Sequence, residues 1–416
     1  MRKNVWIWNH YATNTFFDQG GRHYWFAENL IKEGYKPTIF CATTIHNSNE
    51  IVDTKGKKYS TDSVNDIPYV FVNTPEYKGN GKKRIVNMIS FYRRLFIVAN
   101  EHAELNGKPD VIVASSVHPL TLVAGIKIAN KFGIPCICEV RDLWPESIVA
   151  YGSLKRNSMI AKLLYQGEKW IYEKADKLVF TMEGGRDYII EKGWDKDHGG
   201  PIDINKVYHI NNGVDLGEFN QNKKSFQLKD EDLDNKEIFK VVYTGSIRLV
   251  NKVELLIDVA KQLEDVKVKF LIWGDGDQVE TIKRRIRNEG LSNIVLKGKV
   301  EKKNIPSILV RADLNIILGE TNELFRFGLS PNKLFEYLAA GKPILQTFNA
   351  NYSIVSQNRV GVEVANNDPK EIAEAIRKFI DMNELEYLKF CENAILLSND
   401  YSYEKLTNEL IDIIND

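Results

Sequence analysis

Lys333 and Glu336 stand three residues apart in a stretch with helical spacing, which puts both side chains on one face of the expected helix. The N-terminus of a helix presents unpaired N–H groups and the positive end of its dipole, so it binds phosphate, and Lys333 in the first turn adds a full charge. At a rise of about 1.5 Å per residue, Glu336 lies roughly 7.5 Å from Pro331 along the axis, about one phosphate-to-ribose step. A carboxylate accepts hydrogen bonds from neighbouring hydroxyls. The pair therefore favours a nucleoside diphosphate site, with a capped surface helix as the alternative.

Signals at both ends of the segment 328–343 delimit this helix. Ser330 is a natural N-cap, and Pro331 suits the first helical position because its missing N–H would be unpaired there. Gly341 before Pro343 is typical of a helix stop. The sequence predicts a helix that begins at residue 331.

Gly20 and Gly21 follow the first apolar run and precede a helical stretch, so a ligand phosphate or sugar could approach their backbone closely. The pattern is not Gly-x-Gly-x-x-Gly, which weakens the case for a dinucleotide site. A tight turn is the alternative. His118, Arg141 and Asp142 follow two later apolar runs.

The carboxyl edge of an open α/β sheet is where ligands bind, and His118 is expected at that edge, although a lone histidine can equally be structural. Glu139, Arg141 and Asp142 are expected at the end of the neighbouring strand and could orient the hydroxyls of an acceptor.

The run 78–94 is basic and amphipathic. It contains no acid, and its cations are Lys78, Lys82, Lys83, Arg84, Arg93 and Arg94. Such a segment can lie on an anionic membrane or cradle a polyprenyl diphosphate acceptor. A helix packed on its own sheet with solvated charges is the alternative.

Short apolar runs alternate with longer amphipathic stretches, which is typical of parallel strands joined by helices. The expected strands of the first half are 5–8, 38–41, 69–72, 111–114, 136–140 and 178–181, and those of the second half are 241–243, 268–272, 294–296, 314–318, 344–345 and 361–364. The sequence predicts an α/β protein with an N-terminal Rossmann-like domain, residues 1–205, and a C-terminal one, residues 206–399. A C-terminal helix, residues 400–416, is expected to pack back on the first domain.

The chain has 416 residues, and its 56 basic residues balance its 56 acidic ones, which argues against a protein that coats nucleic acid by bulk charge. No run of eighteen apolar residues is present, so no spanning helix is expected and peripheral membrane contact remains open. We expect a cytosolic protein. The acids show no ligand spacing for a metal.

Two motifs resemble those of the retaining glycosyltransferases of family 4. Glu336 with Gly-Lys-Pro at 341–343 resembles the second half of that family's Glu-x7-Glu motif, and residues 211–215 (NNGVD) resemble its Asn-Gly-Val-Asp strand. Residues 139–147 (EVRDLWPES) and 330–333 (SPNK) resemble the branch that contains N-acetyl-L-fucosaminyltransferases of O-antigen and capsule assembly. The resemblance implies the GT-B fold, with two facing Rossmann-like domains and an interdomain cleft.

The resemblance also implies site residues. It places His118 at the donor sugar and Lys252 and Lys333 at the diphosphate. The implied donor-binding residues are Gly20, Gly21, Gly245, Ser246, Arg248, Gly274, Val300, Ser330, Pro331, Asn332 and Glu336.

The chain departs from the family pattern at two positions. Gly328 stands where the family has its first glutamate, and Glu320 and Glu323 are out of register to replace it. Ser246 stands where relatives have an arginine, so Arg248 either compensates or is a solvated charge.

Together these features predict a metal-independent glycosyltransferase without a cofactor, and the resemblance implies that transfer retains the anomeric configuration. The expected donor is a UDP-sugar, with an N-acetylated amino or 6-deoxyamino sugar. The expected acceptor is a polyprenyl-diphosphate-linked glycan of surface polysaccharide assembly, at the inner face of the cell membrane. A GT-B UDP-sugar 2-epimerase, a nicotinamide oxidoreductase and a sugar-binding module are the alternatives.

Overall fold

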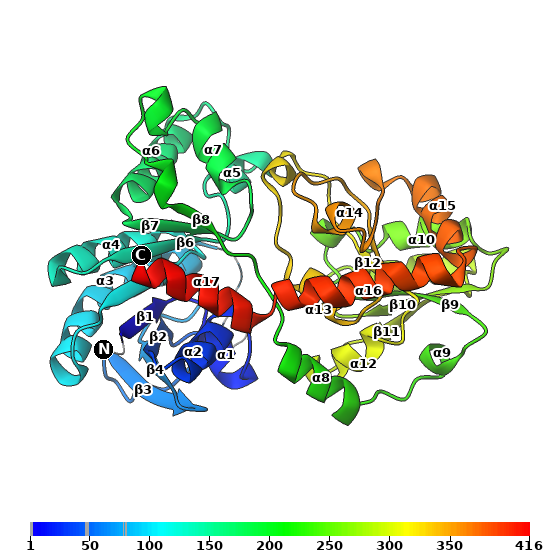
Figure 1. Cartoon of the computed structure of the whole chain (residues 1–416), viewed down its shortest axis with the longest axis horizontal. Helices are drawn as coiled ribbons and strands as arrows, with labels where there is room; N and C mark the ends of the chain where they lie inside the picture. The colour runs from blue at the N-terminus through cyan, green and yellow to red at the C-terminus, as the bar shows by residue number, and fades with distance from the viewer. Residues whose placement is uncertain (1–2, 46–49, 78, 80) are drawn as a thin grey trace. The chain divides into compact units, whose positions relative to one another are not determined.

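The computed structural model describes residues 3–45, 50–77, 79 and 81–416, and the statements below refer to these residues. The chain divides into two compact units (Figure 1). The first consists of Met1–Asn211 with Tyr403–Asp416, and the second of Asn212–Ser402. Each unit is built around one twisted sheet with helices on both faces.

The sheet of the first unit has the strand order β3-β4-β2-β1-β5-β6-β7-β8. Its strands are β1 (Asn4–Trp8), β2 (Lys36–Ala42), β3 (Tyr59–Val64), β4 (Ile67–Val72), β5 (Val111–Ser115), β6 (Cys136–Val140), β7 (Lys177–Phe180) and β8 (Val207–His209). All pair in parallel except β3, which pairs with β4 antiparallel. The central strands are mostly apolar and buried, as expected for a sheet covered on both faces. The edge strand β3 was not expected, because its sequence (YSTDSV) is polar and largely exposed.

Helices cover both faces of this sheet. They are α1 (Thr13–Asp18), α2 (Arg22–Lys32), α3 (Lys82–Asn106), α4 (Pro119–Phe132), α5 (Glu146–Ala150), α6 (Met159–Lys174), α7 (Gly185–Glu191) and α17 (Tyr403–Asn415), with 3-10 turns Lys196–His198 and Ile204–Lys206. The C-terminal helix α17 packs beside α2, where Figure 1 shows the two in contact. Its buried face includes Tyr403, whose ring meets Phe26 edge-on at 5.8 Å.

The second unit has a wholly parallel sheet of order β11-β10-β9-β12-β13-β14. Its strands are β9 (Phe239–Thr244), β10 (Val268–Trp273), β11 (Ile294–Gly298), β12 (Leu314–Ile317), β13 (Ile344–Gln346) and β14 (Gly361–Glu363). Its helices are α8 (Leu216–Ser225), α9 (Glu231–Asp234), α10 (Leu255–Lys261), α11 (Val279–Glu289), α12 (Ile305–Leu309), α13 (Asn332–Ala339), α14 (Ile354–Gln357), α15 (Pro369–Ile380) and α16 (Glu384–Asp400). The 3-10 turns are Leu249–Asn251, Lys302–Asn304, Glu323–Phe327 and Ala365–Asn367. Two apolar cores fill the two faces of this sheet.

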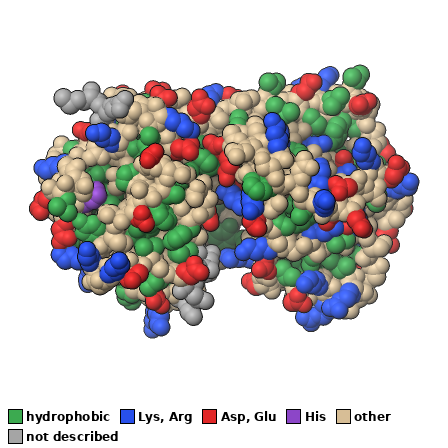
Figure 2. Space-filling view, turned by 90° about the horizontal axis from the view of Figure 1, so that it is seen from below, with side chains coloured by type: hydrophobic (Ala, Val, Ile, Leu, Met, Phe, Trp, Pro, Cys, Tyr) green, Lys and Arg blue, Asp and Glu red, His purple; other side chains and the backbone are tan. Residues whose placement is uncertain are grey.

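The observed division lies between Asn211 and Asn212, six residues after the expected boundary at 205. The reason is β8, which pairs in parallel with β7 and therefore belongs to the first sheet. No helix within the described ranges is long and apolar enough to cross a bilayer. Basic and acidic side chains are interspersed over much of the face seen in Figure 2, in keeping with the net charge of zero.

Candidate functional site

The helix predicted at residue 331 is α13, and it begins one residue later, at Asn332. Pro331 is its N-cap in an extended conformation, so the expected N-cap at Ser330 is wrong. Ser330 instead binds Asn212. Its Oγ accepts a hydrogen bond from Asn212 N at 2.8 Å, and its carbonyl accepts one from Asn212 Nδ2 at 2.7 Å. These bonds hold the chain extended up to Pro331. The exposed Asn332 then occupies the first helical position.

Lys333 reaches from α13 to the loop that follows β9. Its Nζ donates to Tyr243 Oη at 3.1 Å and lies 4.3 Å from the centre of the Tyr243 ring, while Tyr243 Oη donates to Ser246 O at 2.8 Å. Burial lowers the pKa of Lys333 to about 8, although the charge of Glu336 acts in the opposite direction. No carboxylate within the described ranges forms an ion pair with this ammonium, which leaves its charge available to an anion.

Gly245 makes room for that ammonium. The residue has a φ of +144°, and a Cβ built on it would lie 2.8 Å from Lys333 Nζ. Gly274, at the end of β10, packs behind it, because a Cβ there would lie 1.8 Å from Gly245 O. The two glycines therefore bring the carboxyl ends of β9 and β10 and the first turn of α13 together.

Glu336 is half-buried, and its carboxylate has no hydrogen-bond or ion-pair partner within the part of the chain that the structure describes. Burial raises the pKa of Glu336. Among the nearby charges, Lys302 and Lys333 lower this pKa, whereas Glu218 raises it. A partly buried carboxylate without hydrogen-bond partners costs free energy, unless a ligand supplies hydrogen-bond donors. Val300, one of the expected donor-binding residues, is half-buried and packs on the same apolar core as α13.

Arg248 and Lys252 both line a small pocket of about 240 Å³ between the turn Leu249–Asn251 and α11. Lys252 Nζ lies 3.4 Å from a carboxylate oxygen of Glu320, so this lysine is paired in the free protein. Arg248 is exposed and makes no ion pair among the described residues. Ser246 Oγ donates to Asn251 Oδ1 at 2.9 Å.

The backbone at Gly328 has a conformation that a glutamate would not readily adopt. Gly328 has φ 82° and ψ 176°, and its N–H donates to Phe325 O at 3.0 Å. This region of the Ramachandran plot is essentially restricted to glycine, so a glutamate at 328 would be strained.

In the first unit, His118 is the N-cap of α4 and is buried. Its Nε2 shares a 2.6 Å hydrogen bond with His10 Nδ1, and His10 stacks on Phe91 with ring centres 4.3 Å apart. Burial lowers the pKa of His118 to about 3, and the charge of Arg84 acts in the same direction. The other ring nitrogen, Nδ1, is buried without a hydrogen-bond partner in the described ranges.

Sequence reasoning missed His10. The signal was present, because His10 lies just past the end of β1 as His118 lies past the end of β5, and these two strands are neighbours in the sheet. Parallel neighbours bring the residues after their carboxyl ends together.

Gly21 is the N-cap of α2 with φ 97°, and Gly20 is buried beside it. The next residue, Arg22, donates from Nε to Glu139 Oε2 at 2.8 Å and from Nη2 to Ile210 O at 3.0 Å. The backbone at Gly20–Gly21 is therefore fixed by a buried ion pair.

Glu139 is fully engaged by this pair and its neighbours. Ser115 Oγ donates to Glu139 Oε1 at 2.7 Å, and His23 Nε2 lies 3.1 Å from the same oxygen. Burial raises the pKa of Glu139. The charge of Arg22 and the hydrogen bond to His23 outweigh this effect and hold that pKa well below its usual range. The expectation that Glu139 orients acceptor hydroxyls is therefore wrong. Arg141 keeps a buried Nε without a hydrogen-bond partner in the described ranges, and Asp142 is exposed at the same sheet edge.

The basic run predicted from the sequence forms the first half of α3, except that Lys78 lies outside the described residues. Arg84 Nε donates to Tyr11 Oη at 2.8 Å, and Arg94 Nη1 donates to Asn73 O at 2.6 Å. These two arginines are half-buried and hydrogen-bonded within the unit, and their expected place on a membrane face stays a prediction. Lys82, Lys83 and Arg93 are exposed.

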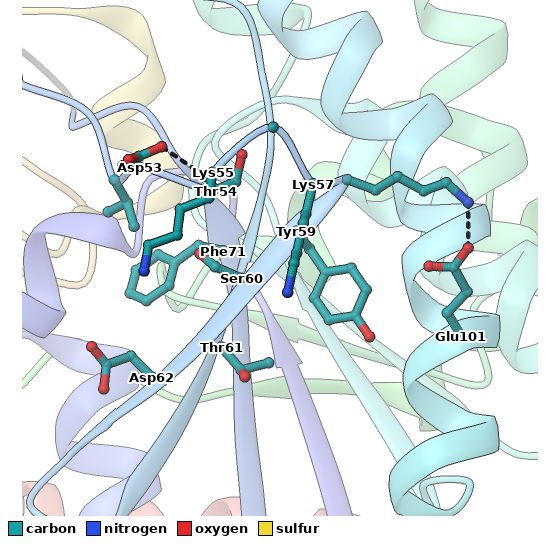
Figure 3. Close-up of a pocket in the computed structure, with 13 residues that line it drawn as sticks. Asp53, Thr54, Lys55, Lys57, Tyr59, Ser60, Thr61, Asp62, Phe71 and Glu101 are labelled. Atoms are coloured by element: carbon teal, nitrogen blue, oxygen red, sulfur yellow. Dashed lines mark hydrogen bonds and ion pairs between the residues drawn. The ribbon is translucent and has the colours of Figure 1, made fainter.

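A pocket of about 810 Å³ in the first unit lies among the loop 52–58, β3 and α3 (Figure 3). Lys58 forms an ion pair with Glu101 across it, and Asp53 Oδ1 accepts from Lys55 N at 2.7 Å. It contains none of the residues predicted from the sequence.

Two family models match the chain. "Glycosyl transferase 4-like domain" matches residues 21–199, and "Glycosyl transferases group 1" matches residues 238–382. The probable glycosyltransferase WbjE of Pseudomonas aeruginosa is 23% identical over 309 residues, covering 71% of this chain and 72% of that protein. TuaH of Bacillus subtilis, a glycosyltransferase assigned to teichuronic acid biosynthesis, is 24% identical over 64% of each chain.

Solved structures share the fold over the whole chain. Sucrose-phosphate synthase from Thermosynechococcus elongatus superposes with a TM-score of 0.73 at 14% identity, covering 100% of this chain and 98% of that one. Anabaena HepE, solved in complex with UDP and glucose, superposes with a TM-score of 0.68 at 14% identity over 100% of both chains. The two family models and the curated relatives together support the assignment of this chain to the GT-B glycosyltransferases of the family 4 type.

Proposed function

We propose that this glycosyltransferase moves an N-acetylated amino or 6-deoxyamino sugar, with retention, from a UDP-sugar to a lipid-linked glycan during bacterial surface polysaccharide assembly. The strings at 139–147 and 330–333 support the sugar class by resemblance. The assignment of TuaH to teichuronic acid biosynthesis supports the polysaccharide role, and the UDP complex of HepE supports the donor.

The observation that carries the donor proposal is the unpaired charge on α13. Lys333 and Glu336 lie one turn apart, and neither has an oppositely charged hydrogen-bonding partner within the described ranges. A nucleoside diphosphate satisfies both, because its phosphates take the helix N-terminus and the ammonium while its ribose diol donates to the carboxylate. We place Gly245 and Gly274 where the backbone must approach the diphosphate.

The chemical step needs charge stabilisation on the leaving diphosphate. As the bond between the anomeric carbon and the β-phosphate oxygen breaks, its electron pair goes to that oxygen, and Lys333, Lys252 and the dipole of α13 offset the developing charge. These cations are the reason for proposing that transfer needs no metal. Lys252 would leave Glu320 and turn to the diphosphate when the donor binds.

The acceptor hydroxyl forms the new bond to the anomeric carbon on the face that the diphosphate leaves. Its proton passes to the departing phosphate oxygen, so this step needs no basic side chain. His118, with its unpartnered Nδ1, is proposed to hydrogen-bond the donor sugar, and Arg141 and Asp142 to orient the acceptor.

The experiment is a screen of UDP release across UDP-sugars, with and without a polyprenyl-diphosphate-linked glycan. Sugar transfer that requires the acceptor is expected. Products formed from the donor alone would favour a UDP-sugar 2-epimerase, which the transferase relatives do not favour.

A further inference from the structure

Three helices of the first unit begin at the same edge of its sheet. α3, α4 and α6 follow the parallel strands β4, β5 and β6 and lead back to β5, β6 and β7. Each helix therefore starts at the carboxyl edge of the sheet. α4 packs against both α3 and α6, so the three form one layer, as Figure 1 shows. The first turns of α3 and α6 thus flank the first turn of α4, whose N-cap is His118.

These first turns expose large apolar side chains. On α6, Met159 is 87%, Ile160 65% and Leu163 72% exposed, and on α3, Ile85 is 56% and Val86 55% exposed. A water-facing helix end with such a cluster marks an interaction site, because removing these side chains from water is favourable.

The two stretches that carry this cluster have charges of one sign. The stretches 82–100 and 151–167 contain no aspartate or glutamate. Their exposed cations that form no ion pair within the described ranges are Lys82, Lys83, Arg93, Lys155 and Lys162. Lysine is depleted in the cores of protein interfaces, whereas lysines around an apolar patch are typical of surfaces that enter the headgroup region of an anionic bilayer.

We infer that the first turns of α3 and α6 together form a docking surface for a bilayer that carries anionic lipids, with Met159, Ile160 and Leu163 as the inserted groups. This inference rests on the proposed function, because a lipid-linked acceptor must be met at a membrane. The same sheet edge holds His118, Arg141 and Asp142, so a bilayer docked there presents a headgroup-linked glycan next to these residues. The predicted basic run contributes only its exposed cations, and α6, which the sequence did not suggest, contributes the inserted side chains.

The test is co-sedimentation of the full chain with vesicles of phosphatidylglycerol and phosphatidylcholine, or of phosphatidylcholine alone. The triple variant M159S/I160S/L163S changes only exposed side chains of α6. Its matched control is L385S/L388S/L396S, which changes three exposed leucines of α16 in the other unit. A second control, L105S, removes an exposed leucine at the opposite end of α3.

We expect the wild type to bind the anionic vesicles and to bind less as salt rises, because the Debye length falls from about 10 Å at 0.1 M to 3 Å at 1 M. The α6 variant should bind at least tenfold more weakly, while both controls bind as the wild type does. A K155Q/K162Q variant should lose part of the preference for anionic over neutral vesicles.

Equal binding by the α6 variant and the wild type would overturn the inference. So would a wild-type dimer that the α6 substitutions convert to a monomer, because the cluster would then be a protein interface. Calorimetric titration of UDP on the same samples separates the two proposals. UDP binding without vesicle binding refutes only the docking surface, and vesicle binding without UDP binding refutes the donor site.

Discussion

The substitution Glu336→Gln keeps the size of the side chain and removes its charge. In the proposed complex the two ribose hydroxyls donate to the carboxylate. A hydrogen bond to a charged group contributes about 1.5–3 kcal/mol and one to a neutral group about 0.5–1.5 kcal/mol, so each bond weakens by about 1 kcal/mol. Two bonds give about 2 kcal/mol, which raises the dissociation constant for UDP about 30-fold. Calorimetric titration with UDP measures this directly.

The same substitution should stabilise the free protein, because burial raises the pKa of Glu336 in the folded state. A carboxyl group with a raised folded pKa favours folding below its unfolded pKa and loses that contribution as pH rises through the folded value. The glutamine variant should therefore unfold at a higher temperature than the wild type at pH 7, with the difference vanishing below about pH 4.

The matched control is Glu374→Gln, on the exposed face of α15 in the same unit. It should change neither UDP affinity nor melting temperature. An unchanged dissociation constant in a folded Glu336→Gln protein, or a lower melting temperature, would refute the assignment of Glu336 to the ligand and make it a structural residue.

Four further outcomes are expected. Lys333→Met should weaken UDP binding at least tenfold at pH 7 and remove the fall in affinity that the wild type shows as pH rises through about 8, measured by calorimetry. Gly245→Ala, whose Cβ would lie 2.8 Å from Lys333 Nζ, should weaken UDP binding in a protein with native circular dichroism, whereas Gly167→Ala, where a Cβ meets nothing within 4 Å, should not. EDTA should leave the transfer rate unchanged, and a loss that magnesium restores would contradict the proposed role of the lysines. His10→Phe should lower the transfer rate at unchanged UDP affinity, because it removes the 2.6 Å partner of His118.

The strand and helix order was predictable because buried parallel strands are continuous apolar runs, and the runs 136–140 and 268–272 coincide with β6 and most of β10. β3 was missed for the opposite reason. It lies at the sheet edge with polar side chains, and what defines it is its antiparallel pairing with β4, which leaves no periodic trace in the sequence.

The candidate site was predictable where chemistry follows local spacing. Lys333 and Glu336 lie on one helix, and a three-residue spacing fixes their relation. Ser330 was misassigned because its partner, Asn212, is more than a hundred residues away. The hydrogen bonds of Arg84 and Arg94 could not be predicted for the same reason. Amphipathic spacing shows which face of a helix a side chain occupies, but not that a long guanidinium reaches back to Tyr11 or Asn73.

The loop after β9 shows how a missing charge can be supplied from elsewhere in the fold. The resemblance places an arginine at 246, where this chain has a serine, and the sequence offered Arg248 as a substitute. Arg248 is exposed, whereas the ammonium of Lys333 enters the same loop, beside Gly245 and on Tyr243, whose hydroxyl donates to Ser246 O. A cation so placed is half-buried before the ligand arrives, and a partly desolvated charge interacts more strongly with a diphosphate than an exposed one does. We therefore propose that Lys333, rather than Arg248, is the cation that this loop offers to the diphosphate. The comparison that distinguishes them is Lys333→Met against Arg248→Met, in which only the first should weaken UDP binding strongly.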